Sequence, residues 1–286
     1  MNENSKIPIT VVVPVKNEEK NLPHCLDLLN DFSEVIVVDS NSTDKTPDIV
    51  KEYGYLFINF EWNGKFPKKR NWVLRNVELK NEWVLFLDAD ELVTDRFKSE
   101  VKQAIKSEIY TGFWVSYQNH FLGKKMKYGV KMKKLSLFKK DNGEYEFIDE
   151  IAWSHFDMEI HEHPIIQGEK GIIKSPIIHL DFKGLSQYIA KHNEYSTWEA
   201  NRYLQLTNKN NKLTFRQRVK YTLVNTWFFG FLYFLLNYIF YLGFLDGRNG
   251  FIFSFYKMQY FFNIKAKLFE YKKTYENLTH NRLPKQ

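Results

Sequence analysis

The chain has 286 residues, with 41 lysines and arginines against 34 aspartates and glutamates, which gives a formal net charge of +7 at pH 7. This length accommodates one large α/β domain or a domain with an appendage, and the positive charge predicts an anionic partner such as nucleotide phosphates or a membrane face. The single cysteine, Cys25, excludes an internal disulfide, and residues 1–8 lack the apolar core of a signal peptide. We therefore expect most of the protein to lie in the cytoplasm.

Strands and helices alternate in the pattern of the first 110 residues. Apolar, β-branched runs that predict buried strands occupy residues 7–15, 35–39, 55–59 and 83–88. A cluster of capping residues predicts a helix that begins near Thr46, and another helix is expected from Lys68 onward. This alternation predicts βαβ units, and so an α/β fold with a mostly parallel sheet flanked by helices.

Three of the predicted strands end in acidic or polar residues. The first is followed by Asn17 and Glu18, the second ends in Asp39, and the fourth runs into Asp88 and Asp90. Because the carboxyl ends of parallel strands share one edge, where open α/β folds bind ligands, we expect these side chains to form one site. A single aspartate after a strand is often only a helix cap, but three successive strand ends favour a nucleotide site.

Two carboxylates at the fourth strand end predict a divalent cation. Asp88 and Asp90 are two positions apart, so in an extended backbone they point the same way, and such a pair suits Mg²⁺ or Mn²⁺. The basic run at 68–70 is unfavourable at a helix N-terminus, which indicates a nearby anion. The chain has no Gly-x-Gly-x-x-Gly and no Walker lysine loop, so dinucleotide dehydrogenases and P-loop NTPases are disfavoured.

Three motifs resemble those of family 2 glycosyltransferases, which have the GT-A (Rossmann-like) fold. They stand in the family's order at Val13–Glu18, Val37–Thr46 and Leu87–Glu91. The likeness is closest to the bacterial branch that builds lipopolysaccharide core and surface polysaccharides. It implies an inverting, metal-dependent enzyme that moves a sugar from a nucleotide-diphosphate donor to a hydroxyl of a membrane-held glycan, lipid-linked or of the lipopolysaccharide type. Asp44, within the second motif, is expected to order its loop.

The resemblance also implies which residues bind the donor. They are Pro14, Val15, Asn17, Glu18, Asp39, Ser40, Asp44, Lys69, Arg70, Asn71, Asp88, Ala89 and Asp90. Among them, Asn17, Glu18 and Asp39 are expected to hold the nucleoside. Asp88 and Asp90 are expected to hold the diphosphate and its Mg²⁺ or Mn²⁺, with Asp90 the more direct metal ligand.

The catalytic base is expected in the second half of the domain. An inverting transfer needs one base within hydrogen-bond reach of the acceptor hydroxyl, and a carboxylate in a partly apolar cleft serves this purpose. Glu162, flanked by His161 and His163, resembles the point where this branch places its base, and Glu150 and Asp149 are the reserves. His161 is expected to orient the site or to contact the diphosphate.

The middle of the chain also carries features with weaker implications. Residues 124–140 are strongly basic, which is typical of a solvated face or of a surface that meets a phosphorylated acceptor or lipid headgroups. Residues 134–139 resemble a strand that usually carries an arginine in the relatives, and no arginine stands at the matching place. His155, His161 and His163 lack the spacing and the second thiolate that would indicate zinc.

The last quarter of the chain is rich in aromatic residues. Residues 221–245 carry no charge and are long enough to cross a bilayer, but their polar and aromatic content and the basic flanks on both sides oppose a crossing. We expect a helical hairpin that lies in, or dips into, the cytoplasmic leaflet of a bacterial inner membrane, as a peripheral or monotopic protein with an anionic membrane surface as partner. A soluble helical subdomain packed on the catalytic unit is the alternative.

These predictions divide the chain into a GT-A domain at 1–212, with a nucleotide-sugar half (1–110) and an acceptor half (111–212), and a helical membrane-associating region at 213–286. A sugar nucleotidyltransferase is one alternative, but residues 16–19 do not resemble its glycine-rich loop. A catalytically silent, membrane-bound nucleotide- or glycan-binding protein is another, which the intact carboxylate set disfavours. Nucleic acid is not an expected partner, because the positive charge gathers beside the donor site and the aromatic tail.

Overall fold

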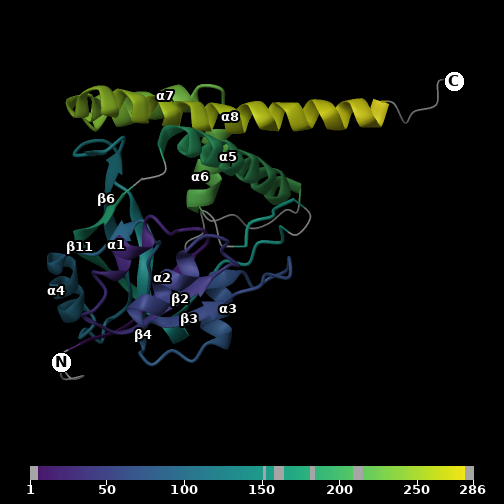
Figure 1. Ribbon diagram of the computed structural model, residues 1–286. Helices are drawn as coiled ribbons and strands as arrows, with labels where there is room; N and C mark the ends of the chain where they lie inside the picture. The colour runs from purple at the N-terminus through teal and green to yellow at the C-terminus, as the bar shows by residue number, and fades with distance from the viewer. Residues whose placement is uncertain (1–5, 151–152, 158–163, 181–183, 209–214, 281–286) are drawn as a thin grey trace. The chain divides into compact units, whose positions relative to one another are not determined.

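A computed structural model of the protein describes residues 6–150, 153–157, 164–180, 184–208 and 215–280. Contacts divide the chain into two compact units, which we call unit 1 (residues 1–125 and 131–182) and unit 2 (residues 126–130 and 183–286). Unit 1 is built on one large sheet and unit 2 is helical (Figure 1). Contacts alone place the helix at 184–208 with the C-terminal helices. The functional boundary at residue 212 stays a prediction.

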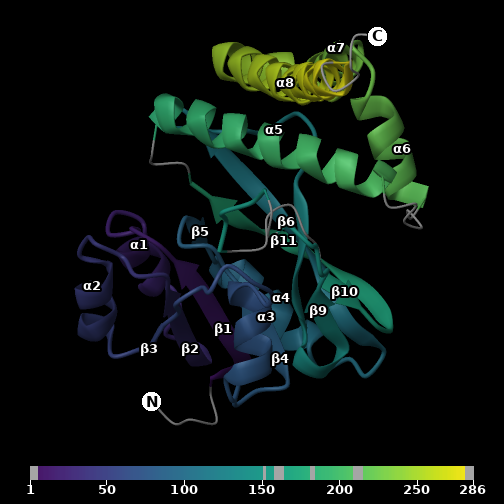
Figure 2. The same cartoon turned by 90° about the vertical axis from the view of Figure 1, so that its right-hand side faces the viewer.

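Four parallel strands make up one side of the sheet in unit 1. They are β1 (Ile7–Val15), β2 (Phe32–Asp39), β3 (Leu56–Asn59) and β4 (Trp83–Phe86). β1 lies between β2 and β4, and β3 lies outside β2 (Figure 2). These strands confirm the four apolar runs of the sequence, since strands rich in β-branched residues favour a sheet covered on both faces.

The other side of the sheet runs in both directions, so the sheet is mixed rather than mostly parallel. Its strands are β5 (Glu91–Leu92), β6 (Tyr110–Phe121), β7 (Lys124–Lys125), β8 (Lys133–Lys139) and β11 (Glu169–His179). β8 is antiparallel to both β4 and β6, and β11 is parallel to β6 and antiparallel to β5. The expectation of a mostly parallel sheet is wrong for this half, because regular strand–helix alternation stops after α4 (Asp95–Ala104). A separate pair, β9 (Gly143–Tyr145) and β10 (Pro164–Ile166), is also antiparallel.

Successive side chains of the central strands pack into two cores. Val11, Val13 and Val15 of β1 face the core that includes α1 (Leu22–Leu26), α2 (Thr46–Tyr53) and α4. Val12, between them, faces the opposite core with α3 (Lys69–Asn76). Since both faces are covered by apolar contacts, the polar groups of these strands gather in the loops at their carboxyl ends.

Four helices and two short turns of helix form unit 2. They are α5 (Gly184–Asn208), α6 (Phe215–Val224), α7 (Phe229–Leu235), the π-helical turn η3 (Leu236–Phe240), the 3₁₀ turn η4 (Gly243–Asp246) and α8 (Gly247–His280). Their small core consists of Ala200, Val224, Ile264 and Leu268. α7 packs closely on α8 because Gly230 has no side chain: a Cβ there would lie 2.7 Å from the carbonyl oxygen of Met258.

The loop at 126–130 belongs to unit 2 through its backbone. Four successive N–H groups, from 127 to 130, donate hydrogen bonds to the turns between α7 and α8. Asp246 accepts the first two at 3.1 and 2.9 Å, the carbonyl of Tyr241 accepts the third, and the side chain of Asn237 accepts the fourth at 2.8 Å. The buried amide of Asn237 also donates to Ser254 on α8 at 2.7 Å. These bonds fix the hairpin between α7 and α8 around the loop.

No single helix in the described part of the chain is long and apolar enough to cross a bilayer. Residues 217–224 and 229–240 meet the criteria of length and composition only as a pair, and the chain bends by 108° at the break between them. The uncharged stretch 221–245 is therefore divided among α6, α7, η3 and η4 rather than forming one helix.

Candidate active site

The loops after β1 and β2 are interlocked by hydrogen bonds. Asn17 has a left-handed backbone (φ 56°), which asparagine tolerates, and its side chain accepts the N–H of Thr43 at 2.8 Å. Its own N–H donates to the hydroxyl of Ser42 at 2.8 Å. Ser42 in turn donates its N–H and its hydroxyl to Asp39, which is buried. The first two acidic strand ends therefore converge as the sequence predicts.

Asp44 orders both of these loops. Its carboxylate accepts the N–H groups of Glu19 at 3.1 Å and of Thr46 at 3.0 Å, and the hydroxyl of Thr46 accepts the N–H of Glu18 at 2.9 Å. Burial alone would raise the pKa of Asp44, but the hydrogen bonds from Thr46 and Glu19 outweigh it and lower the pKa. The carboxylate thus holds the start of α2 against the loop after β1.

Each cation at the start of α3 faces a carboxylate from another segment. The pairs are Lys68 with Glu150, Lys69 with Asp157 at 3.4 Å, and Arg70 with Asp88 at 2.8 Å. Positive charge is unfavourable at a helix N-terminus, and these carboxylates compensate for it. The anion that the basic run predicted is therefore supplied, at least in part, by the protein itself.

Lys69 and Asn71 form hydrogen bonds with the backbone of other segments of unit 1. Nζ of Lys69 donates to the carbonyl of Val15 at 3.0 Å, and the side chain of Asn71 exchanges two bonds with the backbone of Tyr145, at 2.8 and 2.9 Å. Burial lowers the pKa of Lys69, and the nearby charge of Asp157 opposes this shift only in part. For Asp157, burial alone would raise the pKa, but the charge of Lys69 outweighs burial and the pKa is lowered. Asp157 was not predicted, since no motif marks it. Contact of Lys69 with a diphosphate stays a prediction.

The acidic residues after β4 lie in a turn. β4 ends at Phe86, and the carbonyl of Asp88 accepts the N–H of Glu91 at 2.9 Å. Asp88 and Asp90 consequently have different partners, and the expectation that an extended backbone points them the same way is wrong. Ala89, between them, is buried.

Asp88 is neutralised from two sides. One oxygen accepts a bond from Arg70 at 2.8 Å and the other from Lys134 on β8 at 3.0 Å. Lys134 also pairs with Glu91, whose pKa burial raises to about 7 against the opposing charge of Lys134. Burial alone would lower the pKa of Lys134, but Asp88 and Glu91 outweigh it and raise the pKa. Lys134 thus supplies positive charge from the strand on which the resemblance expects an arginine.

Asp90, Glu91 and His179 form a group that suits a divalent cation. One ligand atom of each lies within 4.8 Å of the others. Nε2 of His179, at the end of β11, lies 3.4 Å from Asp90, and its Nδ1 lies 3.3 Å from the side-chain oxygen of Asn119. Burial would lower the pKa of His179, but its bond with Asp90 outweighs this and raises the pKa. Two carboxylates and an imidazole fit Mn²⁺, and less readily Mg²⁺. Of the two predicted metal ligands, only Asp90 belongs to this group.

The candidates for the catalytic base are only partly described. Glu162 and His161 lie outside the described residues, so their roles stay predictions. Glu150 is buried against Lys68, and Asp149 is exposed. A buried carboxylate with an ion-pair partner is poorly available to take a proton, so the structure favours Glu150 less than the sequence does.

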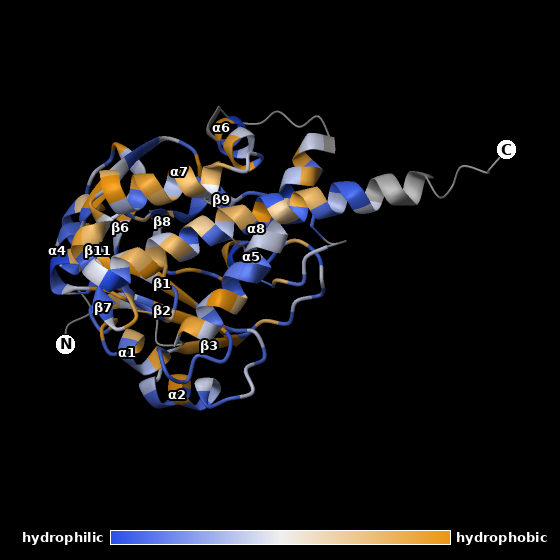
Figure 3. Cartoon of the chain, turned by 90° about the horizontal axis from the view of Figure 1, so that it is seen from above, coloured by the Kyte–Doolittle hydropathy of each residue, from blue (hydrophilic) through white to orange (hydrophobic). Residues whose placement is uncertain are grey.

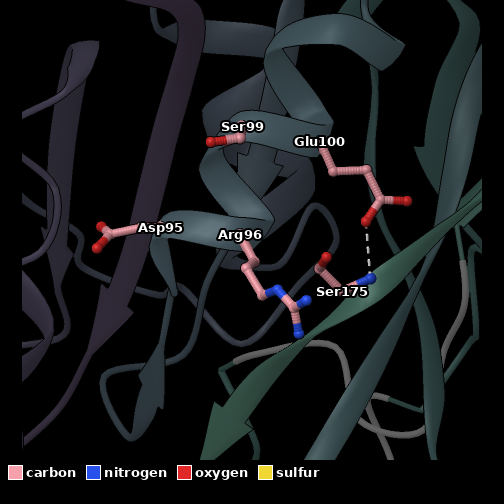
Figure 4. Close-up of a pocket in the computed structure, with 5 residues that line it drawn as sticks. All are labelled: Asp95, Arg96, Ser99, Glu100 and Ser175. Atoms are coloured by element: carbon pink, nitrogen blue, oxygen red, sulfur yellow. Dashed lines mark hydrogen bonds between the residues drawn. The ribbon is translucent and has the colours of Figure 1, made fainter.

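The remaining predicted donor residues lie at the same strand ends. Pro14 and Ser40 are buried, and the N–H of Ser40 donates to the carbonyl of Val15 at 3.1 Å. A depression between α4 and β11 is separate from this site. It is lined by Asp95, Arg96, Ser99, Glu100 and Ser175 (Figure 4).

Comparison with known proteins identifies relatives of this chain. The model of a family described as "Glycosyl transferase family 2" matches residues 10–158, about half of the chain. The SPbeta prophage-derived glycosyltransferase SunS of Bacillus subtilis (strain 168) is 36% identical over 108 residues, which are 36% of this chain and 25% of SunS. The chain therefore spans about a quarter of the length of that relative. The lipopolysaccharide core biosynthesis glycosyltransferase LpsC of Rhizobium meliloti (strain 1021) is 24% identical over 213 residues, 70% of this chain and 73% of LpsC.

A solved structure shares the fold over most of the chain. Mannosyltransferase PcManGT from Pyrobaculum calidifontis, in complex with GDP-Man and Mn²⁺, aligns with a TM-score of 0.52 at 16% identity, over 93% of this chain and 88% of its own. This likeness shows an α/β fold of the GT-A type, with a mixed sheet flanked by helices and a C-terminal helical region.

Replacing Asp44 by asparagine tests the interlocked loops. The amide offers one acceptor oxygen to two N–H donors, so Asp44→Asn should lower the free energy of unfolding by about 1 kcal/mol at neutral pH. Because the pKa of Asp44 is lowered in the folded state, its contribution is present above the ordinary value of 3.8 and is lost as the pH falls through the folded value. Urea unfolding followed by tryptophan fluorescence should show the difference from the wild type shrinking at low pH. Asp48→Asn, on the exposed face of α2, is the control; equal stability of Asp44→Asn and wild type at neutral pH would contradict the assignment.

Replacing His179 by alanine tests the metal group. The change removes the one nitrogen ligand of this group among the described residues, so Mn²⁺ affinity measured by titration calorimetry should fall by about tenfold or more. His155→Ala removes an exposed histidine of the same unit and should leave the affinity unchanged. Unaltered Mn²⁺ binding in His179→Ala would mean that this side chain is not a ligand.

Proposed function

Because this chain belongs to glycosyl transferase family 2, we propose that it transfers a sugar from a nucleotide-diphosphate donor to a hydroxyl group of an acceptor glycan, with inversion at the anomeric carbon. The observation that carries the proposal is the convergence of the loops after β1 and β2 with the acidic turn after β4. These segments contain the three motifs, and a sheet edge of this kind is where α/β folds bind nucleotides.

The interlocked loops are the proposed nucleoside site. Asn17, Glu18 and Asp39 offer oxygen acceptors, which suit the N–H groups of a nucleobase and the hydroxyls of a ribose. Asp39 is held by Ser42, and the loop by Asp44, so the acceptors are fixed before the donor binds. Such pre-organisation lowers the entropy cost of binding.

The acidic turn and its cations are the proposed diphosphate site. Arg70 and Lys134 place two positive groups beside Asp88, from which charge-assisted bonds can reach phosphate oxygens. Mg²⁺ or Mn²⁺ bound by Asp90, with Glu91 and His179, would neutralise the negative charge of the diphosphate. The solved mannosyltransferase with this fold carries Mn²⁺ together with GDP-Man.

Glu162 is the proposed base. The resemblance supports it, and the structure gives the reserve Glu150 a buried partner in Lys68. The carboxylate of Glu162 takes the proton of the acceptor hydroxyl as the oxygen forms its bond to the anomeric carbon, and the bond to the diphosphate oxygen breaks on the opposite face. His161 is proposed to orient this site. One displacement accounts for inversion without a glycosyl-enzyme intermediate.

Unit 2 is proposed to bind the cytoplasmic face of a bacterial inner membrane. Its helices and turns expose a dense set of apolar side chains, which include Trp227, Phe228, Phe231, Leu232, Leu236, Ile239, Phe240, Leu242, Phe244, Leu245, Phe251 and Phe255. Figure 3 colours α7 and much of α8 as hydrophobic. Water-exposed apolar groups at this density mark interaction sites, and exposed Arg218, Arg248 and Lys272 suit anionic headgroups.

A membrane-held acceptor follows from this surface. An enzyme that rests on the bilayer meets acceptors whose lipid end is embedded there, and the relative LpsC is described as acting in lipopolysaccharide core biosynthesis. We therefore propose a lipid-linked or lipopolysaccharide-type glycan as the acceptor class.

Two variants separate the metal role from the base role. With a panel of nucleotide sugars and bacterial membrane extract, Asp90→Ala and Glu162→Gln should each lower kcat by roughly 10²–10⁴-fold. Asp90→Ala should also weaken nucleotide binding in the presence of Mn²⁺, whereas Glu162→Gln should leave it unchanged. Asp95→Asn, at a fully exposed carboxylate on α4, is the control. Near-normal turnover in both variants would refute these roles.

Charge placed on the apolar surface tests membrane binding. Phe228 and Phe240 are each 74% exposed, so the double variant Phe228→Glu/Phe240→Glu should fold, yet lose more than about tenfold in binding to phosphatidylglycerol vesicles in a flotation assay. Ile109→Glu, at a residue of unit 1 that is 69% exposed, should float like the wild type. Flotation of the double variant at the wild-type level would rule out this surface.

A further inference from the structure

Lys257, on α8, is half-buried and lies against α5 within unit 2. Its Nζ lies 3.3 Å from Nε2 of His192 on α5 and 5.5 Å from the ring centre of Phe253. Across the described residues, no carboxylate is paired with it. Burial lowers the pKa of Lys257 to about 8, and the positive charge of Lys191 acts in the same direction.

Other lysines that reach α5 are matched by oxygen acceptors. Lys267, farther along α8, donates to four of them at 2.6 to 2.8 Å: the carbonyl and side-chain oxygens of Asn193 and the hydroxyls of Ser196 and Thr197. Lys220 pairs with the buried carboxylate of Glu199 at 2.6 Å. Lys257 instead faces an imidazole and a second lysine. Lys267 and Lys220 are therefore bonded to oxygen acceptors, whereas the described neighbours of Lys257 offer it none.

The hydrogen bonds of His192 determine which N–H donors of Lys257 remain available to a ligand. Its Nδ1 lies 2.9 Å from the carbonyl oxygen of Tyr188, and because a carbonyl only accepts, Nδ1 carries the proton. In the neutral ring Nε2 is then an acceptor, and the ammonium of Lys257 donates one of its three N–H bonds to it. No described residue accepts the other two N–H bonds of Lys257, which can therefore be donated to a ligand.

The surroundings of this cluster are aromatic and, at the rim, apolar. The ring of His192 packs against Tyr188 at a tilt of 30° with centroids 3.9 Å apart, and it meets the edge of Tyr260 at 5.7 Å. Tyr256 packs on Tyr188, and Ile189 and Phe255 are exposed beside the cluster. Within the described part of the chain, the titratable neighbours of Lys257 are thus lysine, histidine and tyrosine side chains, none of which carries a negative charge at neutral pH.

We propose that Lys257, Lys191 and His192 form a phosphate-binding site in unit 2. A phosphate monoester or diester would accept the two remaining N–H bonds of Lys257 and offset the repulsion between the two lysines. The exposed apolar rim suits a phosphate attached to a lipid. Through this site unit 2 would recognise a lipid headgroup or a lipid-linked acceptor, which makes the proposed function more specific. Only the source of the phosphate rests on that function.

Titration of Lys257 in the full-length protein tests the site directly. With lysines labelled at Cε, NMR should show the Lys257 signal, assigned by its loss in Lys257→Met, titrating near pH 8 in buffer without phosphate. Added ligand should move this midpoint toward the ordinary lysine value of 10.5. The probes are glycerol 3-phosphate and phosphatidylglycerol vesicles, each compared with an uncharged counterpart (glycerol and neutral glycolipid vesicles).

The probes distinguish the source of the phosphate. A shift with both probes, or with glycerol 3-phosphate alone, supports a site for soluble phosphate esters, and a shift with vesicles alone supports a lipid headgroup. No shift with either probe overturns the proposal. Sugar transfer is measured separately, so an inactive protein whose Lys257 still responds to phosphate would refute the proposed function and leave the site intact.

Matched variants control for loss of folding. Lys191 is exposed, so Lys191→Met should fold and should weaken binding of the responding probe by about tenfold, the loss of one charge-assisted contact. Lys272→Met removes an exposed lysine from α8 outside the cluster and should change binding little. Equal loss in the two variants would mean that general charge attraction, and not this site, holds the phosphate.

Discussion

The carboxylates that follow β4 depend on cations that three other segments deliver. Ligand atoms of Asp90, Glu91 and His179 lie within 4.8 Å of one another. Two negative charges at this spacing repel by about 3–4 kcal/mol at the effective dielectric of a protein near its surface. Lys134 from β8 and His179 from β11 offset that repulsion, and Arg70 from α3 neutralises the neighbouring Asp88. The acidic turn is therefore stabilised where these segments meet, at the edge of the sheet that is proposed to bind the donor.

The polar and charged groups of unit 2 have different roles from those of unit 1. There the exposed surface is largely apolar, and the buried polar groups serve to hold the hairpin: Asn237 and Asp246 bind the backbone of loop 126–130. Lys257 is the exception, since among the described residues it faces Lys191 and His192 rather than an acid. The proposed nucleotide site at the sheet edge and the proposed lipid-binding surface of unit 2 would together suit a transferase that acts on membrane-held glycans.

The half of the fold that depends on local pattern follows from the sequence. β1 to β4, and the helices that begin at Thr46 and Lys69, agree with runs of apolar residues and with capping signals, because these act over a few neighbouring residues. The direction of β8 and β11 has no such signal. It is decided by which strand each one pairs with, and the sheet became mixed where direct strand pairing replaced strand–helix alternation.

The acidic motifs at three strand ends and the aromatic-rich last quarter can be read from the sequence alone. Only the tertiary structure decided the partners: Lys134, His179 and Asp157 reach the site from segments distant in the chain, and no local pattern encodes a contact set by sheet register. Likewise, composition marked residues 221–245 as uncharged, whereas the break between α6 and α7 and the wrapping of the hairpin around loop 126–130 arise from packing and hydrogen bonds between segments. The spacing of residues in the sequence identifies neighbours along the chain, whereas the site consists of residues that are neighbours only in space.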